Sequence, residues 1–161
     1  MGSSFHQIHY ESPIDLMEII GTEEAICSIM FSEKMNQEHP TGLNTPLVLN
    51  LCVQELDEYF KGTRHEFTFP YTFEGTSFQK TVWTALKGIP YAYTASYKDL
   101  AVSIGNEKAI RAVGSANGKN RLSIVIPCHR IIGTNGKLTG YAGGLWRKEW
   151  LLQHEKILKK E

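Results

Sequence analysis

The sequence predicts an α/β protein in two parts: a small N-terminal α/β lobe over residues 1–74 and a mostly helical C-terminal domain over residues 75–161. Strand-like segments on either side of a turn precede one amphipathic helix in the first part, whereas short helical segments separated by glycine dominate the second. The 161 residues are 42% hydrophobic and 21% charged. This composition is too apolar for a disordered chain, and the length suits one domain, or one large and one small.

The lobe is predicted to contain a β-hairpin over residues 16–31, a loop over 41–45, a helix over 46–60 and a strand over 65–69. The hairpin centres on the turn-like Gly21–Glu24. Pro46 stands where a proline is favoured at a first helical position, and Gly62 follows the last periodic residue. Cys27 and Cys52 are expected to pack as small apolar residues, so no catalytic cluster is predicted in this part.

The second part is predicted to contain helices over residues 77–86, 97–104, 107–113 and 145–158, a buried strand over 122–126, a turn at 133–136 and a glycine-rich loop at 140–144. Ser77 and Ser96 are the expected N-caps of the first two helices. Gly105-Asn106 separates the second helix from the third. Two short helices across a glycine-containing turn are typical of a helix-turn-helix, whose second helix reads DNA.

Charge is divided unequally between the two parts, although the whole chain has a formal net charge of zero. Residues 1–75 hold three basic and twelve acidic side chains, whereas residues 76–161 hold fourteen basic and five acidic ones. The net charges are therefore −9 and +9. Either the basic part turns a face toward a polyanion, or the two parts neutralise each other across an internal interface.

The predicted DNA-reading helix carries unusually small side chains. Ala112 and Gly114 stand close to Arg111, and small side chains beside one arginine let a helix approach a narrow groove. The minor groove of DNA is the narrow one. Tight packing against another helix would explain the small residues equally well.

Cys128 is the candidate reactive residue. It follows Pro127 at the end of the predicted strand, which places it on a turn, and His129 and Arg130 come next. Basic neighbours favour the thiolate, the nucleophilic form of cysteine. Burial in a core is the ordinary alternative for a single cysteine. The three cysteines are odd in number and widely spaced, which favours a reduced cytoplasmic protein, and no apolar run approaches the ~20 residues of a membrane span.

The motifs of the second part resemble the O6-alkylguanine-DNA alkyltransferases (methylated-DNA–protein-cysteine methyltransferases). The matching segments, in order and spacing, are Phe78-Gln79, Val82-Trp83, Ser96-Tyr97, Arg111-Ala112-Val113-Gly114, Asn120, Pro127-Cys128-His129-Arg130, residues 140–144 and residues 148–152. They span residues 75–156. Residues 1–74 resemble the family only in general shape.

This resemblance implies a direct-reversal DNA repair protein that is consumed by its reaction. An alkyl group, such as methyl, would pass irreversibly from O6-alkylguanine in DNA to Cys128, after minor-groove binding and nucleotide flipping. His129 would take the thiol proton through a water, Glu155 would orient that histidine, and Tyr97 would donate toward the leaving guanine. No cofactor and no metal are implied.

The resemblance also implies two sets of binding residues. The substrate-binding set is Tyr141, Ala142, Ile131, Asn120 and Lys148, and the DNA-binding set is Arg111, Ala112, Gly114, Lys119, Arg121 and Arg130. Tyr141 would form a wall of the alkyl pocket, and Arg111 would fill the space that the flipped nucleotide leaves. Many relatives have proline after the residue that matches Asn120, whereas this chain has Arg121, which puts the rigidity of that turn in question.

Two other functions stay open at this point. A non-catalytic sensor of alkylguanine is disfavoured because Cys128 is retained. A cysteine hydrolase using Cys128 and His129 would leave the helix-turn-helix and Arg111 without a purpose. The expected partner is double-stranded DNA that contains O6-alkylguanine, and the protein is expected to be a monomer.

Overall fold

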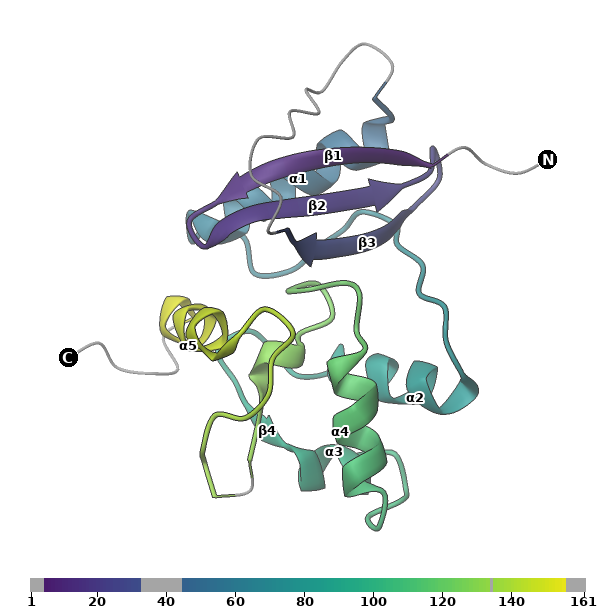
Figure 1. The fold of residues 1–161 in the computed structure, drawn as a ribbon, viewed down its shortest axis with the longest axis vertical. Helices are drawn as coiled ribbons and strands as arrows, with labels where there is room; N and C mark the ends of the chain where they lie inside the picture. Colours follow the sequence, from purple (N-terminus) through teal and green to yellow (C-terminus); the bar gives the residue numbers. More distant parts are fainter. Residues whose placement is uncertain (1–4, 33–44, 134, 156–161) are drawn as a thin grey trace. The chain divides into compact units, whose positions relative to one another are not determined.

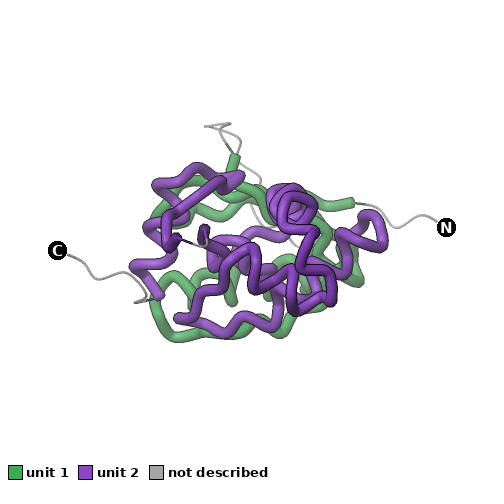
Figure 2. Tube along the Cα trace, turned by 90° about the horizontal axis from the view of Figure 1, so that it is seen from below, with its two compact units in different colours: residues 1–73 green, residues 74–161 purple. Residues whose placement is uncertain are grey.

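The chain divides into two compact units, residues 1–73 and residues 74–161, which Figure 2 colours separately. The computed structural model describes residues 5–32, 45–133 and 135–155. The loop predicted at residues 41–45 therefore falls almost entirely outside the described residues, as does the end of the last predicted helix.

The first unit is a three-stranded antiparallel sheet with one helix (Figure 1). Its elements are β1 (His6–Ser12), β2 (Asp15–Gly21), β3 (Ile26–Phe31) and α1 (Leu47–Phe60). The strands lie in the order β1-β2-β3, and α1 contacts all three of them. Ile19 on the central strand is paired with Ile8 and Ile29, and all three side chains are buried. Alternation along each strand thus builds one apolar face beneath the helix.

Sequence reasoning predicted only a hairpin here and missed β1. This strand is polar, with Ile8 its one buried residue, so it lacks the apolar alternation by which strands are recognised. The helix was placed correctly to within one residue: Pro46 is the N-cap of α1, and Gly62 follows the helix with a φ of +82°.

The strand predicted over residues 65–69 was wrong, because the chain there is irregular. The backbone N–H of Thr68 donates to the buried carboxylate of Glu55 at 2.6 Å. The Glu55 side chain thus satisfies the Thr68 N–H, which in a strand would pair with a carbonyl of a neighbouring strand. The bridge to the sheet comes slightly later, where Tyr71 pairs with Ile26 of β3.

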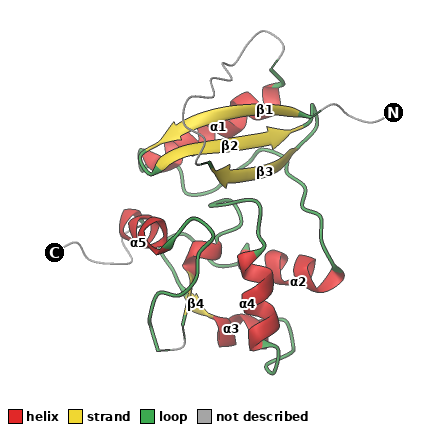
Figure 3. Ribbon diagram, in the orientation of Figure 1, coloured by secondary structure: helices red, strands yellow, loops and turns green. Residues whose placement is uncertain are grey.

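The second unit is mostly helical, as Figure 3 shows by colour. Its elements are α2 (Ser77–Leu86), β4 (Ala95–Ser96), α3 (Tyr97–Ser103), α4 (Ile110–Gly118), the 3-10 turn η1 (Cys128–Arg130), β5 (Ile131–Ile132) and α5 (Leu145–His154). The two short strands pair in parallel, and α4 packs against both α2 and α3. The fold class predicted from the sequence is confirmed.

Capping residues set where the helices of the second unit begin. Ser96 caps α3 and forms a capping box with Asp99, as the sequence predicted for that serine. Thr76, and not the predicted Ser77, caps α2 through a capping box with Gln79. The second helix of the helix-turn-helix begins at Ile110, three residues later than predicted, because the preceding residues form a turn in which Ala109 N–H donates to the Asn106 carbonyl.

The strand predicted over residues 122–126 was also wrong. This segment is a series of turns, in which Ile126 N–H donates to the Leu122 carbonyl at 2.9 Å and Ile124 has a φ of +73°. Leu122, Ile124 and Ile126 are nonetheless buried. Their apolar pattern therefore records burial and not extended backbone, a distinction that periodicity alone does not make.

We predict that Gly105→Ala lowers the free energy of unfolding by about 1 kcal/mol, because Gly105 has a φ of +78°, a left-handed conformation that a Cβ disfavours. Gly118→Ala is the matched control. An added Cβ meets nothing within 4 Å at either position, but Gly118 is helical, where alanine is preferred over glycine by roughly 0.5–1 kcal/mol. Equilibrium urea unfolding of both variants measures the difference. Equal effects would contradict this assignment of the turn.

Candidate active site

Cys128 lies at the start of η1, with Pro127 as the residue that precedes the turn. Its side chain is 5% exposed. The side-chain nitrogen of Asn120 is 3.3 Å from the Cys128 Sγ and 2.8 Å from the Ile126 carbonyl oxygen, to which it donates. The Asn120 Oδ1 accepts the N–H of Leu122 at 2.9 Å. One amide therefore braces the turns before Cys128 and also contacts the sulfur.

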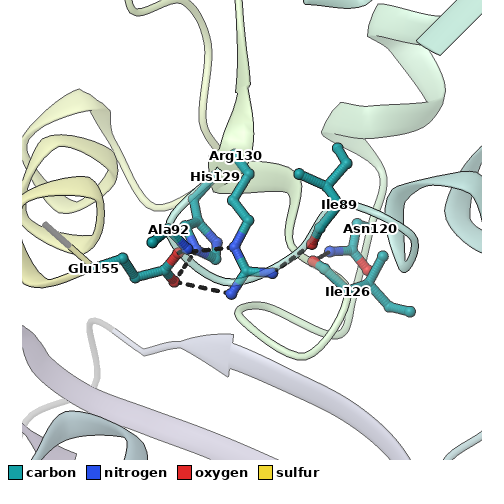
Figure 4. Close-up of polar contacts among 7 residues, drawn as sticks. All are labelled: Ile89, Ala92, Asn120, Ile126, His129, Arg130 and Glu155. Carbon is teal, nitrogen blue, oxygen red and sulfur yellow. Dashed lines mark hydrogen bonds and ion pairs between the residues drawn. The ribbon is translucent and has the colours of Figure 1, made fainter. Parts of the chain in front are cut away.

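His129, Arg130 and Glu155 form a buried cluster next to Cys128 (Figure 4). The Nε2 of His129 is 2.7 Å from Glu155 Oε2. Arg130 donates to both carboxylate oxygens, from Nε at 2.8 Å and from Nη2 at 3.1 Å. The backbone N–H of Ala92 donates to Oε1 at 3.3 Å. The structure thus brings Glu155, to which the resemblance assigns the orientation of His129, within hydrogen-bond distance of that histidine.

The electrostatics of this cluster follow from burial and hydrogen bonding. Burial raises the pKa of Glu155, but the hydrogen bonds from His129 and Arg130 and the charge of Arg130 outweigh it and leave that pKa well below its ordinary value. Burial lowers the pKa of His129, and the charge of Arg130 lowers it further, against the opposing effect of Glu155. Glu155 is therefore an anion and His129 is neutral at pH 7.

The protonation states fix the tautomer of His129. An anionic carboxylate only accepts hydrogen bonds, so Nε2 of His129 must hold the ring proton. Nδ1 is then a bare acceptor. This atom is buried and has no hydrogen-bond partner among the residues that the structure describes. A proton acceptor is thus left available on the residue that follows the thiol.

Lys148 is a buried lysine of α5. Its Nζ donates to the backbone carbonyl of Thr139 at 2.7 Å. Burial lowers the pKa of Lys148 to about 8, although the nearby Cys128 opposes this effect. Burial raises the pKa of Cys128, whereas the hydrogen bond from Asn120 and the charge of Lys148 lower it. The ease of forming the thiolate therefore depends on these two neighbours.

Tyr97 is the first residue of α3, and the pairing of Ser96 with Ile132 holds it beside the strand that follows η1. The hydroxyl of Thr139 donates to the Tyr97 oxygen at 3.0 Å. The proton of Tyr97 is therefore free to be donated elsewhere. Thr139, which the sequence did not single out, thus contacts both Tyr97 and Lys148.

The remaining substrate-binding candidates lie in β5 and in the loop before α5. Ile131 is buried in β5. Tyr141 and Ala142 occupy the loop, where Ala142 is exposed and the Tyr141 carbonyl accepts the N–H of Gly144 at 2.8 Å. Burial raises the pKa of Tyr141 well above its ordinary value, and the neighbouring Cys128 adds to this shift. Tyr141 therefore stays a neutral phenol near the sulfur.

Most of the DNA-binding candidates lie on or just after α4. Arg111 and Ala112 are exposed on this helix, and Lys119 and Arg121 are exposed where it ends. Gly114 is half-buried, and a Cβ at this position would lie 3.7 Å from the ring of Tyr97. That distance is ordinary van der Waals contact, so packing against Tyr97 does not itself require glycine at this position.

Arg130 is a correction to the predicted DNA-binding set. Its side chain is 7% exposed, and Nε, Nη1 and Nη2 all donate to protein oxygens. A guanidinium engaged in this way is not available to a phosphate. The sequence places Arg130 beside His129 but gives no sign that it contacts Glu155, which is distant along the chain.

Two further features bear on the class of protein. Among residues 5–32, 45–133 and 135–155, no helix is both long and apolar enough to cross a membrane. The same described ranges contain no group of three or more His, Cys, Asp and Glu side chains that could hold a metal ion.

The chain is similar to known proteins over almost its whole length. Residues 77–157 match the family described as 6-O-methylguanine DNA methyltransferase, DNA binding domain, and residues 6–73 match the ribonuclease-like domain of the same proteins. A methylated-DNA–protein-cysteine methyltransferase of Methanosarcina acetivorans is 45% identical, covering 91% of this chain and 95% of the relative. The constitutive enzyme of Bacillus subtilis is 42% identical, covering 94% and 95%.

Solved structures give the same result. The crystal structure of Mycobacterium tuberculosis O6-methylguanine methyltransferase has a TM-score of 0.84 at 39% identity, covering 95% of this chain and 93% of that one. A structure of the Mycobacterium tuberculosis protein OGT in complex with DNA has a TM-score of 0.84 at 42% identity, covering 94% and 92%. With both domains matched and a relative aligned over 91% of this chain, the chain belongs to the 6-O-methylguanine DNA methyltransferase family.

Proposed function

We propose that this protein repairs DNA by transferring the methyl group of O6-methylguanine irreversibly to the sulfur of Cys128. The observation that carries this assignment is the setting of that thiol. Sγ contacts the amide of Asn120, and the next residue, His129, has a bare Nδ1 and is anchored to Glu155. The family supplies the reaction, and this geometry supports Cys128 as its acceptor.

In the first step, His129 Nδ1 takes the thiol proton through a bridging water, which leaves the nucleophilic thiolate. The sulfur then attacks the methyl carbon. The S–C bond forms as the bond from carbon to O6 breaks, and the electron pair of that bond goes to the guanine. Tyr97 donates its phenolic proton to the departing base, because Thr139 donates to the Tyr97 oxygen and leaves this proton free.

The substrate is double-stranded DNA that contains O6-alkylguanine. The relative of known structure from Mycobacterium tuberculosis binds DNA, and α4 presents the exposed Arg111 and Ala112 in the present chain. A base within a duplex is out of reach of a buried thiol, so the nucleotide is flipped out of the stack. Arg111 then fills the space that the nucleotide leaves.

The protein reacts once and acts as a monomer. The product is a thioether at Cys128, which is stable to water, so each chain repairs one lesion. Tyr97, Cys128, Lys148 and the other residues of the candidate site all lie within residues 74–161. A free thiol suits the reducing cytoplasm, where we place the reaction.

We predict that the intact mass of the protein increases by one methyl group after mixing with a duplex that contains one O6-methylguanine. Peptide mapping will locate this group on Cys128. Cys128→Ser should bind the same duplex without gaining mass, because a serine hydroxyl is far less easily ionised. Label on Cys27 or Cys52 would contradict the assignment, as would continued turnover beyond one lesion per chain.

The role of Arg111 is tested by comparing two substrates. Arg111→Ala should slow single-turnover transfer from a methylated duplex by about tenfold or more, because flipping costs a few kcal/mol that Arg111 offsets in part. Transfer from free O6-benzylguanine, which needs no flipping, should change little. Ala112→Leu should have the same selective effect by blocking groove approach, since Ala112 is exposed and its enlargement leaves the fold intact.

Lys119→Ala is the control for this comparison. It should weaken duplex binding with and without the lesion, and the salt dependence should become shallower by about one phosphate contact. Equal losses for Arg111→Ala on the duplex and on the free base would assign Arg111 to the pocket or to the fold instead.

Lys148→Met should move the alkylation of Cys128 by iodoacetamide to higher pH, because the lysine charge lowers the pKa of the thiol. The difference from the unmodified protein should be largest below pH 8 and shrink above it, since Lys148 itself loses its proton at about that pH. Lys119→Met, a charge removed from the surface, should leave the profile unchanged. A profile that does not move in Lys148→Met would show that the thiol is activated without this lysine.

A further inference from the structure

Arg130 uses its guanidinium entirely inside the protein. Nε and Nη2 hold the two oxygens of Glu155, and Nη1 donates to the Ile89 carbonyl at 2.7 Å. The guanidinium carbon also lies over the ring of Tyr91, 5.7 Å from its centroid. Figure 4 shows the guanidinium between Glu155 on one side and Ile89 on the other. This is a bidentate arginine–carboxylate pair, the geometry in which arginine binds most strongly.

The carboxylate of Glu155 accepts N–H groups at both of its oxygens. Oε1 accepts from Arg130 Nε and from the Ala92 backbone, and Oε2 accepts from His129 and from Arg130 Nη2. Because arginine is permanently charged, the buried pair of Arg130 and Glu155 has no net charge. His129 thus bonds to a carboxylate that is held in a fixed orientation and whose negative charge is balanced by Arg130.

We infer that Arg130 is a positioning residue that keeps Nδ1 of His129 free of a proton, by holding Glu155 as an anion and neutralising its charge. His129 then begins the reaction as a base. Only this last step, the use of the base on the thiol of Cys128, rests on the proposed function. Arg130 itself is assigned no contact with the substrate.

Removal of Arg130 would leave one buried negative charge, and the cluster would take up a proton to balance it. A proton on His129 gives an imidazolium, in which Nδ1 is protonated. A proton on Glu155 makes the carboxyl a donor to Nε2, which forces the ring proton onto Nδ1. Either way Nδ1 ceases to be an acceptor, so the consequence does not depend on where the proton resides.

The other charged and titratable groups near His129 do not replace Arg130. Lys148 opposes protonation of His129 through its charge, but its Nζ donates to the Thr139 carbonyl. Cys128 is a thiol at rest, and Tyr91, whose pKa burial raises, is a neutral phenol. Arg130, by contrast, donates directly to both carboxylate oxygens.

A purely structural role is the competing explanation, because Arg130 also ties the Ile89 carbonyl to the cluster. Loss of a tether would lower the free energy of unfolding, but it would not change which nitrogen of His129 is protonated. The state of Nδ1 therefore separates the two explanations.

The test uses the full-length chain with ¹⁵N-labelled histidine, and the His129 signals are assigned by their loss in His129→Gln. At pH 7 the unmodified protein should show a proton on Nε2 and none on Nδ1. Arg130→Met should show Nδ1 protonated. Arg130→Lys keeps the charge without the bidentate fork and the tether, so Nδ1 should remain bare. Protonation of Nδ1 in Arg130→Lys, or a bare Nδ1 in Arg130→Met, would overturn the inference.

A double variant gives the sharpest control. Arg130→Met combined with Glu155→Gln removes both charges together, so His129 should be uncharged at pH 7, because no buried negative charge remains for a proton to balance. An imidazolium in this double variant would also overturn the inference. This variant contains no unbalanced buried charge, so it stays informative if Arg130→Met alone does not fold.

Alkylation of Cys128 by iodoacetamide, followed by peptide mass, supplies a second readout. In Arg130→Met the pH profile should move, because a proton on Nδ1 changes the group that stands next to the thiol, and it should stay unmoved if the role is structural only. Neither readout involves DNA. If the unmodified protein transfers no methyl group from a methylated duplex, the proposed function fails, and the state of Nδ1 still decides the inference about Arg130.

Discussion

The buried carboxylate of Glu155, at the end of α5, accepts N–H groups from η1 and from the loop that precedes β4. A charge in this position is tolerated only while its donors stay in place, because an unpaired buried carboxylate is strongly destabilising. The end of α5, the turn that holds Cys128 and the loop at Ala92 therefore cannot shift independently. Ala92 has a φ of +68°, an uncommon conformation for a residue with a Cβ. In this conformation its backbone N–H donates to Glu155.

Around Cys128 the physical effects oppose one another. Burial hides the thiol from water and raises its pKa, whereas Asn120 and Lys148 lower it. Asn120 links this chemistry to the fold, because the same amide that contacts the sulfur also holds the backbone at Leu122 and Ile126. The turn is thus fixed by side-chain hydrogen bonds. It does not depend on the proline that many relatives have at the position of Arg121, which is exposed here.

The sequence predicted the helix ends that local residues determine, but it did not predict the features that depend on tertiary contacts. Ser96 and Gly62 determine helix ends through their own backbone and side-chain chemistry, so the sequence was sufficient to place them. Ile124 was assigned to a strand because apolar runs in turns and in buried strands look alike. Arg130 was assigned to DNA with the resemblance, and nothing in its sequence neighbourhood indicates that it is buried. Its partner Glu155 is distant in sequence, and only the folded chain brings them together.

Only a short segment separates the helix that carries Arg111 from the turn that holds Cys128. α4 ends at Gly118, and Asn120, two residues later, already contacts the Cys128 sulfur. The helix is also fixed within the unit, because its Ala116 carbonyl accepts from the Trp83 ring nitrogen of α2 at 2.8 Å. The exposed face of α4 and the buried thiol are consequently parts of one rigid arrangement. The fold therefore sets the position of the Cys128 sulfur relative to Arg111.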